Sequence, residues 1–223
     1  MGKNAKPSRL SLSKGLFITF EGIEGSGKTT QAERAFEAVK LDGYSCVFTR
    51  EPGGTEVSEK IRSILLDKAN SEMTPICELF LYLASRSQNI SQTIKPALEK
   101  GDIVIADRFS DSTVAYQGGG RGLDKEMIKT LNDLATNGLK PGLTILVDID
   151  PAKGLDRSES RDRIEMESIN FHRRVRREFL RIAEEEPKRV ATVDGDNDSD
   201  SVHEQIMTII RQYITGQTRP DGG

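Results

Sequence analysis

Residues 22–29, Gly-Ile-Glu-Gly-Ser-Gly-Lys-Thr, have the GxxxxGK[ST] spacing of a loop that binds phosphate. The glycines allow successive backbone N–H groups to curl around an anion, and a helix that begins here adds the positive end of its dipole. Lys28 is expected to reach the outer phosphates of a nucleoside triphosphate, and Thr29 to hold Mg²⁺ through its hydroxyl. We therefore predict a triphosphate site that consists of Gly22, Ile23, Glu24, Gly25, Ser26, Gly27, Lys28, Thr29 and Thr30.

Asp107 and Arg108 directly follow the apolar run 103–106, which is typical of a buried strand. An acidic residue at a strand end opposite a phosphate loop is suited to organise Mg²⁺ through coordinated water, although Asp is also a common helix N-cap. For Asp107 we favour the metal role. Arg108 and Arg50 each follow a predicted strand, and guanidinium groups match phosphate geometry. Two such arginines beside a triphosphate loop indicate a second, phosphorylated substrate.

The polar segment 154–163 carries Arg157, Arg161 and Arg163 between two predicted helices. It is either a solvated surface turn or part of a lid, at about 153–165, whose arginine folds over the phosphoryl group in transfer. Residues 116–122, Tyr-Gln-Gly-Gly-Gly-Arg-Gly, also allow two interpretations. They predict either an irregular turn or a close approach of the backbone to a ligand.

The elements that must position these residues alternate along the chain. Apolar runs typical of buried strands occupy 16–20, 45–49, 103–106, 143–149 and 189–193. Helical periodicity occupies 30–41, 56–66, 74–99, 124–137, 165–186 and 199–214. This order predicts an α/β fold of three layers, with a central parallel five-stranded sheet and helices on both faces. Ligands of such sheets bind at the carboxyl ends of the strands, so the loops beginning at Glu21, Arg50, Asp107 and Asp148 are expected around one crevice.

The length of 223 residues suits a single domain, which we place at 15–215. We expect residues 1–14 to be a disordered tail, because they are basic and Ser-rich without an apolar signal core, and residues 216–223 to be frayed. Their resemblance to an organelle transit peptide is weak.

Composition excludes several classes of function. With 30% charged residues and a net charge of −3, the chain lacks the basic field of a nucleic-acid-binding protein. No apolar run approaches the roughly 20 residues that span a membrane. Two histidines argue against a His-based metal site, and we interpret Cys46 and Cys77 as reduced core residues.

Three segments together resemble the thymidylate kinase family: FEGIEGSGKTTQ at 20–31, TREPGGT at 49–55 and DRFSDSTVAYQGGGRG at 107–122. The resemblance continues through TILVDIDPAKGL and DRIEMES and covers about residues 16–214. It implies a P-loop kinase that transfers the γ-phosphoryl group of ATP to dTMP, giving dTDP and ADP for dTTP synthesis. It also implies Mg²⁺ as cofactor, a homodimer and a cytoplasmic location.

The resemblance assigns roles in dTMP binding. It implies that Arg50 and Arg108 clamp the phosphate of dTMP and that Glu24 accepts a hydrogen bond from the 3′-hydroxyl. By the same resemblance Tyr116 excludes ribonucleotides, while Arg86 and Gln117 read the polar edge of thymine. Tyr82 occupies the position whose aromatic ring stacks on the base, with Phe80 as the competing candidate. Ser112 completes the expected substrate site.

For catalysis, the resemblance implies roles for Lys28, Asp107 and one arginine of the lid. One group of the family carries this arginine directly after the acidic residue of the phosphate loop, where this chain has Gly25. The bacterial-like group carries it in the lid, so the candidates are Arg157 and Arg161. We favour Arg161, and we expect adenine near the lid base and residues 194–196. The alternatives are a kinase of dUMP or dCMP and a non-enzymatic P-loop switch, for which the expected NKxD segment is absent from the sequence.

Overall fold

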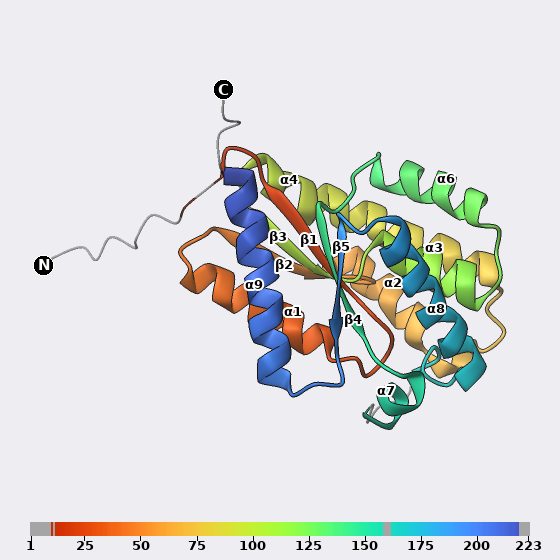
Figure 1. The fold of residues 1–223 in the computed structure, drawn as a ribbon. Helices are drawn as coiled ribbons and strands as arrows, with labels where there is room; N and C mark the ends of the chain where they lie inside the picture. The colour runs from red at the N-terminus through yellow and green to blue at the C-terminus, as the bar shows by residue number, and fades with distance from the viewer. Residues whose placement is uncertain (1–9, 11, 158–161, 219–223) are drawn as a thin grey trace, which may run out of the picture.

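Five parallel strands form the centre of the fold in this computed structural model, which describes residue 10, residues 12–157 and residues 162–218. The order across the sheet is β2-β3-β1-β4-β5, so β1 is central and carries the phosphate loop at its carboxyl end (Figure 1). The strands are β1 Leu16–Glu21, β2 Cys46–Arg50, β3 Ile103–Asp107, β4 Leu143–Asp148 and β5 Val190–Asp194. The predicted fold class is confirmed, and each predicted strand lies within a few residues of its observed position.

Successive residues of each strand point to opposite faces, and each face has its own apolar cluster. Ile18 and Phe20 of β1 point to the face covered by α1 (Lys28–Leu41) and α9 (Ser199–Thr218). Phe17 points to the other face, where it packs near Ile94 in the helical run behind the sheet. Because both faces are covered, the strands are apolar on both sides, which explains their continuous apolar sequence.

The second face is covered by one long helical run and by α8 (Ile169–Glu185) (Figure 1). The run consists of α3 Pro75–Asn89, the π-helical turn Ile90–Ile94 and α4 Lys95–Glu99, and it matches the helix predicted at 74–99. Outside it lie α2 Glu56–Leu66, the 3-10 turn Lys68–Asn70 and α6 Lys125–Thr136.

Two helical segments were not predicted. Residues 110–120, which include the glycine-rich stretch, form α5 Ser110–Thr113 and a π-helical segment Val114–Gly120. The interpretation of this stretch as an irregular turn is therefore wrong for residues 116–120. Close packing explains Gly119 and Gly120, since an added Cβ would lie 2.8 Å from the Cβ of Glu178 and 2.5 Å from the ring of Phe171, respectively. The base of the expected lid is helical as well, as α7 Pro151–Arg157.

The predicted termini also need correction. Leu10 forms a parallel bridge with Tyr44, and the Leu12 N–H donates to the carbonyl oxygen of Gly101 at 2.9 Å, so order begins before residue 15. Helix α9 extends to Thr218, beyond the predicted end of the domain. Cys46 is buried as predicted, but Cys77 is exposed at the start of α3 and is not a core residue. Among the described residues, no helix is long and apolar enough to cross a membrane.

Candidate active site

The phosphate loop joins buried strand β1 to helix α1, as the sequence predicts. Gly22, Gly25 and Gly27 all adopt positive φ, at 147°, 68° and 85°, a backbone region that favours glycine. Gly27 is the N-cap of α1 and makes no side-chain capping bond. The first N–H groups of the helix thus face the loop without a side-chain acceptor, which is suited to an anion.

Thr29 and Asp107 meet across the carboxyl ends of β1 and β3. The Thr29 hydroxyl donates to Asp107 Oδ2 at 2.6 Å, while Oδ1 of the same carboxylate is buried and has no hydrogen-bond partner among the described residues. Hydroxyl and carboxylate oxygens are ligands that Mg²⁺ prefers, and Mg²⁺ is usually held by one or two such groups together with substrate phosphates. The described residues contain no cluster of three or more acidic, His or Cys metal ligands. The pair therefore fits Mg²⁺ shared with a nucleotide.

A cavity of about 270 Å³ lies beside the phosphate loop, at the predicted edge of the sheet. Most of the predicted site residues line it: Glu24, Gly25, Lys28, Thr29, Arg50, Tyr82, Asp107, Arg108, Ser112, Tyr116 and Gln117. Asp148, which ends β4, is paired with Arg176 at 2.7 Å and does not line this cavity. The segment that follows it still contacts the phosphate loop, through Gly154 of α7.

Four cations surround this cavity: Lys28, Arg50, Arg62 and Arg108. Burial lowers the pKa of Lys28, and the neighbouring Arg108 charge lowers it further. Arg50 is held on the rim by Glu59 at 3.1 Å. Arg50 and Arg108 thus line the same cavity as the phosphate loop, as a second phosphorylated substrate would need. Five carboxylates line the same cavity, namely Glu24, Glu51, Asp107, Asp162 and Glu165, and Glu24 pairs with Arg108.

Sequence reasoning missed Arg62, which donates to the carbonyl oxygen of Pro52 at 2.8 Å. Arg62 lies on the inward face of α2. The buried residues Ser58 and Leu65 lie four positions before it and three positions after it, and residues at this spacing share one face of a helix. The other cavity residues that were not predicted are Glu51, Pro52, Leu66, Thr113, Asp162, Ile164 and Glu165.

Arg108 has an unusual left-handed backbone, with φ of 72°, immediately after β3. This conformation turns its side chain toward the phosphate loop, where it donates to the Gly22 carbonyl oxygen at 3.0 Å and to Glu24 Oε1 at 3.0 Å. The Tyr116 hydroxyl donates to the same Glu24 oxygen at 2.6 Å, and the guanidinium lies 4.9 Å from the centre of the Tyr116 ring.

Glu24 is thus at the centre of a buried cluster. Burial alone would raise its pKa, but the neighbouring His172 ring and the charges of Arg108 and Lys28 lower it to about 2. The ring of His172, on α8, lies 3.2 Å from Glu24. His172 was not predicted, and no local motif marks it, because α8 reaches the loop only through the tertiary fold.

Of the two aromatic candidates for base stacking, one lines the cavity and the other does not. Tyr82 lines the cavity, whereas Phe80 is 54% exposed and does not line it. Gln117 is almost completely buried, and its Nε2 donates to Glu78 Oε1 at 2.8 Å. Glu78 also pairs with Arg121 at 2.9 Å and with Arg163 at 2.7 Å. Burial would raise the pKa of Glu78, but hydrogen bonds from Arg121 and Gln117 lower it, so Glu78 is an acceptor only.

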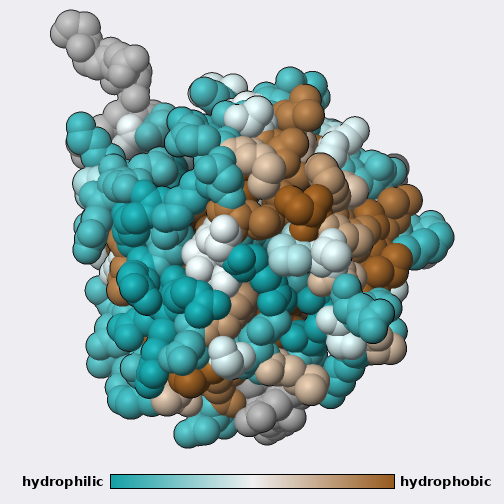
Figure 2. Space-filling model, turned by 90° about the vertical axis from the view of Figure 1, so that its right-hand side faces the viewer, coloured by the Kyte–Doolittle hydropathy of each residue, from teal (hydrophilic) through white to brown (hydrophobic). Residues whose placement is uncertain are grey.

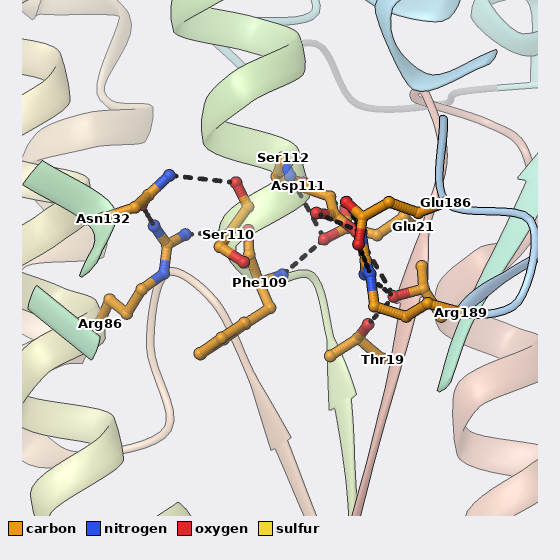
Figure 3. Close-up of polar contacts among 11 residues, drawn as sticks. Thr19, Glu21, Arg86, Phe109, Ser110, Asp111, Ser112, Asn132, Glu186 and Arg189 are labelled. Carbon is orange, nitrogen blue, oxygen red and sulfur yellow. Dashed lines mark hydrogen bonds and ion pairs between the residues drawn. The ribbon is translucent and has the colours of Figure 1, made fainter. Parts of the chain in front are cut away.

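Arg86 lies behind the lining of the cavity. It is 1% exposed and is not among the described residues that line the cavity. Its Nε–H donates to Glu51 at 2.7 Å, and its Nη1 donates to Thr113 and Asn132 at 2.8 and 2.6 Å. Its Nη2 donates to the Phe109 carbonyl oxygen at 2.9 Å (Figure 3). The guanidinium therefore joins the walls of the cavity, and its expected contact with the base stays a prediction.

The two candidate lid arginines are Arg157 and Arg161. Arg157, at the end of α7, donates to the Gly195 carbonyl oxygen at 2.9 Å and pairs with Asp196. It therefore lies at the loop after β5, where adenine is expected, and not at the cavity. Lys153 also pairs with Asp196. Arg161 lies outside the described residues.

Comparisons with known proteins agree with this geometry. The family profile described as thymidylate kinase matches residues 20–206. A thymidylate kinase of Pelobacter propionicus is 50% identical over 213 residues, which cover 92% of this chain and 97% of that protein. One of Geotalea daltonii is 48% identical, covering 91% and 99%. The crystal structure of thymidylate kinase from Ehrlichia chaffeensis aligns with a TM-score of 0.74 and 36% identity, over 89% of this chain and 99% of that one. With the phosphate loop, the Thr29–Asp107 pair and the arginine-lined cavity in place, these matches establish that the chain belongs to the thymidylate kinase family.

Proposed function

We propose that the protein transfers the γ-phosphoryl group of ATP to the phosphate of dTMP, giving dTDP and ADP. The observation that carries this proposal is the single cavity in which the phosphate loop faces Arg50, Arg62 and Arg108. Lys28 and the loop N–H groups would hold the donor, and the arginines would hold the acceptor phosphate. Two mutually repelling anions are then placed end to end for in-line transfer.

The chemistry needs no strong general base, because the acceptor phosphate, whose second pKa is about 6, is already ionised at pH 7. What the protein must supply is position and positive charge. The Thr29 hydroxyl and Asp107 carboxylate would hold Mg²⁺, directly or through water, and the bound ion would neutralise charge on the phosphates. We assign the catalytic charge of the lid to Arg161 and an adenine contact to Arg157. The contacts of Arg157 with residues 195 and 196 support the second assignment.

On the acceptor side, we assign the 3′-hydroxyl of dTMP to Glu24 and the phosphate to Arg50 and Arg108. The ionised state of Glu24 supports this assignment, since an ionised carboxylate can only accept hydrogen bonds. Tyr116, fixed by its bond to Glu24 at 2.6 Å, would occupy the space of a ribose 2′-hydroxyl. Tyr82 would stack on the base.

The Gln117 amide supports selection of the base. Because the ionised Glu78 requires a donor, Gln117 must present its Nε2 to Glu78 and keep its Oε1 for the substrate. An acceptor at this position matches the N3–H of thymine or uracil, whereas N3 of cytosine is itself an acceptor. This argues against dCMP as the preferred substrate. It does not separate dTMP from dUMP, which differ only by a methyl group.

The direct test measures ADP release from ATP with dTMP, dUMP, dCMP or no acceptor. We expect dTMP to give the highest kcat/KM, and ATP bound without turnover in the presence of dTMP would favour a nucleotide switch instead. Lys28→Ala should lower kcat by about 100-fold or more, with little change in dTMP affinity. Lys95→Ala, at an exposed lysine of α4 outside the cavity, is the control and should keep kcat.

We further propose a homodimer that works in the cytoplasm. Exposed apolar residues gather on α2 and α3, namely Val57, Ile64, Ile76 and Phe80. Figure 2, which faces the side of these helices, has a band of apolar surface among polar surface, as expected for an interface. Sedimentation should give a dimer for the wild type and a monomer for Phe80→Glu. Leu41→Glu, at an exposed leucine that ends α1 on the other face of the sheet, should stay dimeric. Cell fractionation tests the compartment.

A further inference from the structure

Glu21, the last residue of β1, is completely buried and contacts the turn that follows β3 (Figure 3). Its Oε1 accepts from the backbone N–H groups of Phe109 at 2.8 Å and Ser112 at 3.3 Å. Its Oε2 lies 2.5 Å from the Ser112 hydroxyl. Helix α5 has no side-chain cap of its own, since its N-cap residue is Phe109. Glu21 therefore caps this helix from the neighbouring strand, directly before the phosphate loop.

Glu21 differs from the other buried glutamates around the cavity in its partners. Glu24, Glu51 and Glu78 each form an ion pair with an arginine. Within the described part of the chain, Glu21 forms no such pair and hydrogen-bonds only to the backbone of residues 109 and 112 and to the Ser112 hydroxyl. A buried carboxyl without a bonded cation favours its neutral form.

Charges of both signs face Glu21. Asp111 and Arg108 approach from the segment after β3, and Lys28 approaches from α1. Burial raises the pKa of Glu21 to about 8, with a further contribution from Asp111, although Arg108 and the hydrogen bonds from Ser112 and Phe109 act to lower it. Asp111 is paired with Arg189 at 2.7 Å. Arg108 is already bonded to Glu24.

The Ser112 hydroxyl has one hydrogen, and its direction depends on Glu21. Arg108 Nη1 donates to the Ser112 oxygen at 3.1 Å, so this oxygen already accepts one hydrogen bond. If Glu21 is ionised, the hydroxyl hydrogen must point at Oε2, because a carboxylate can only accept. If Glu21 is protonated, Oε2–H donates to Ser112, and the hydroxyl hydrogen is released toward the cavity that Ser112 lines.

We propose that Glu21 is a positioning residue that stays protonated in the working enzyme and turns the Ser112 hydroxyl toward the phosphate of dTMP. The inference rests on the proposed function, because it takes dTMP as the occupant of the cavity. Glu21 does not touch the substrate. It acts through Ser112 and through the turn that carries Arg108.

The test is the KM for dTMP of the full-length enzyme from pH about 7 to about 9, where the phosphates of both substrates stay ionised because their second pKa is about 6, and where thymine keeps its N3–H. Ionisation of Glu21 should raise the wild-type KM by about tenfold above pH about 8, through loss of one hydrogen bond to a charged group. Glu21→Gln should keep the low KM throughout, because its amide N–H donates to Ser112 at every pH. Ser112→Ala should show the high KM at all pH values, without a step.

A wild-type KM without a step, or the same step in Glu21→Gln, would overturn the proposal. Absence of dTMP-dependent ADP release at every pH would instead overturn the proposed function. Infrared spectra give a readout that needs no turnover and no folded variant. The wild type should show a protonated-carboxyl band at pH about 7 that is lost at pH about 10, and its absence at pH about 7 would also refute protonation of Glu21.

Discussion

A Cβ atom at Gly25 would lie 1.8 Å from the carbonyl oxygen of Gly154, because the phosphate loop and helix α7 meet backbone to backbone. The contact is reciprocal, since a Cβ at Gly154 would lie 2.5 Å from the Glu24 carbonyl oxygen. The base of the expected lid therefore rests directly on the phosphate loop. An arginine after the acidic residue of the loop, as one group of the family carries it, has no space here.

Gly25→Ala should be far more destabilising than Gly27→Ala. Both positions have positive φ, so both substitutions add backbone strain of about 1–2 kcal/mol. Only Gly25 adds a collision, because a Cβ at Gly27 meets nothing within 4 Å. We expect the free energy of unfolding of Gly25→Ala, measured by urea titration without nucleotide, to be lower by at least about 2 kcal/mol than that of Gly27→Ala. Equal values would mean that α7 moves away from the loop at little cost.

Glu78→Gln should weaken the discrimination between thymine and cytosine. A glutamine at position 78 can donate as well as accept, so Gln117 is no longer forced to present its Oε1 to the base. Comparing kcat/KM for dTMP and 5-methyl-dCMP isolates this edge, because both bases carry the methyl group. We expect the ratio to fall by about tenfold or more.

The matched control for this experiment is Glu167→Gln. Glu167 also pairs with Arg121, but it does not contact Gln117. The substitution removes one ion pair of the same arginine and should leave the ratio unchanged. A similar loss of discrimination in both variants would assign the effect to Arg121 and not to the orientation of Gln117.

The sheet and the phosphate loop were predictable because their signals are local. Buried strands such as 103–106 are continuous apolar runs, and the loop spacing fixes Lys28 and Thr29 relative to the helix start. The register that places Asp107 opposite Phe20 follows from parallel pairing, so the Thr29–Asp107 contact was inferable from strand ends alone.

The direction of a long side chain was not predictable. Arg86 shares a helix with Tyr82, four residues before it, yet its guanidinium meets Glu51, Thr113 and Asn132 from three other segments. Nothing in the local sequence sets these partners. His172 reaches Glu24 in the same way, through packing of α8. Cys77 illustrates the opposite error, because an apolar residue type at the first turn of a helix does not by itself imply burial.

Arg86→Lys should destabilise the fold more than it weakens base recognition. A lysine ammonium cannot reproduce the planar guanidinium that joins these segments, and it leaves Glu51 buried without its partner. We expect a loss of about 3 kcal/mol in the free energy of unfolding. Arg50→Lys, at a half-exposed arginine paired with Glu59, should cost less than about 1 kcal/mol. Reduced dTMP affinity of Arg86→Lys at unchanged stability would support a direct role in reading the base.

Glu24→Gln should remove a pH dependence of stability on the acid side. The folded pKa of Glu24 is about 2 against an ordinary value of 4.5, so its contribution is present above pH about 4.5 and is lost as pH falls toward about 2. The full contribution is about 3 kcal/mol. Urea titrations at neutral and acid pH should therefore show that the variant loses less stability than the wild type on acidification. If the wild type and the variant lost equal stability on acidification, the pKa of Glu24 would have to be equally low in the folded and unfolded states.

Glu21→Gln should have the opposite sign, although Glu21 and Glu24 are only three residues apart. The folded pKa of Glu21, about 8, lies above its ordinary value of 4.5, so its contribution is present at pH below about 4.5 and is lost as pH rises through about 8. Between these values the wild type should lose roughly 1.4 kcal/mol per pH unit relative to Glu21→Gln. The two proteins should thus diverge in urea titrations from pH about 5 to about 9. A constant difference in stability between the two proteins over this range would mean that Glu21 is already ionised in the folded protein at pH about 5.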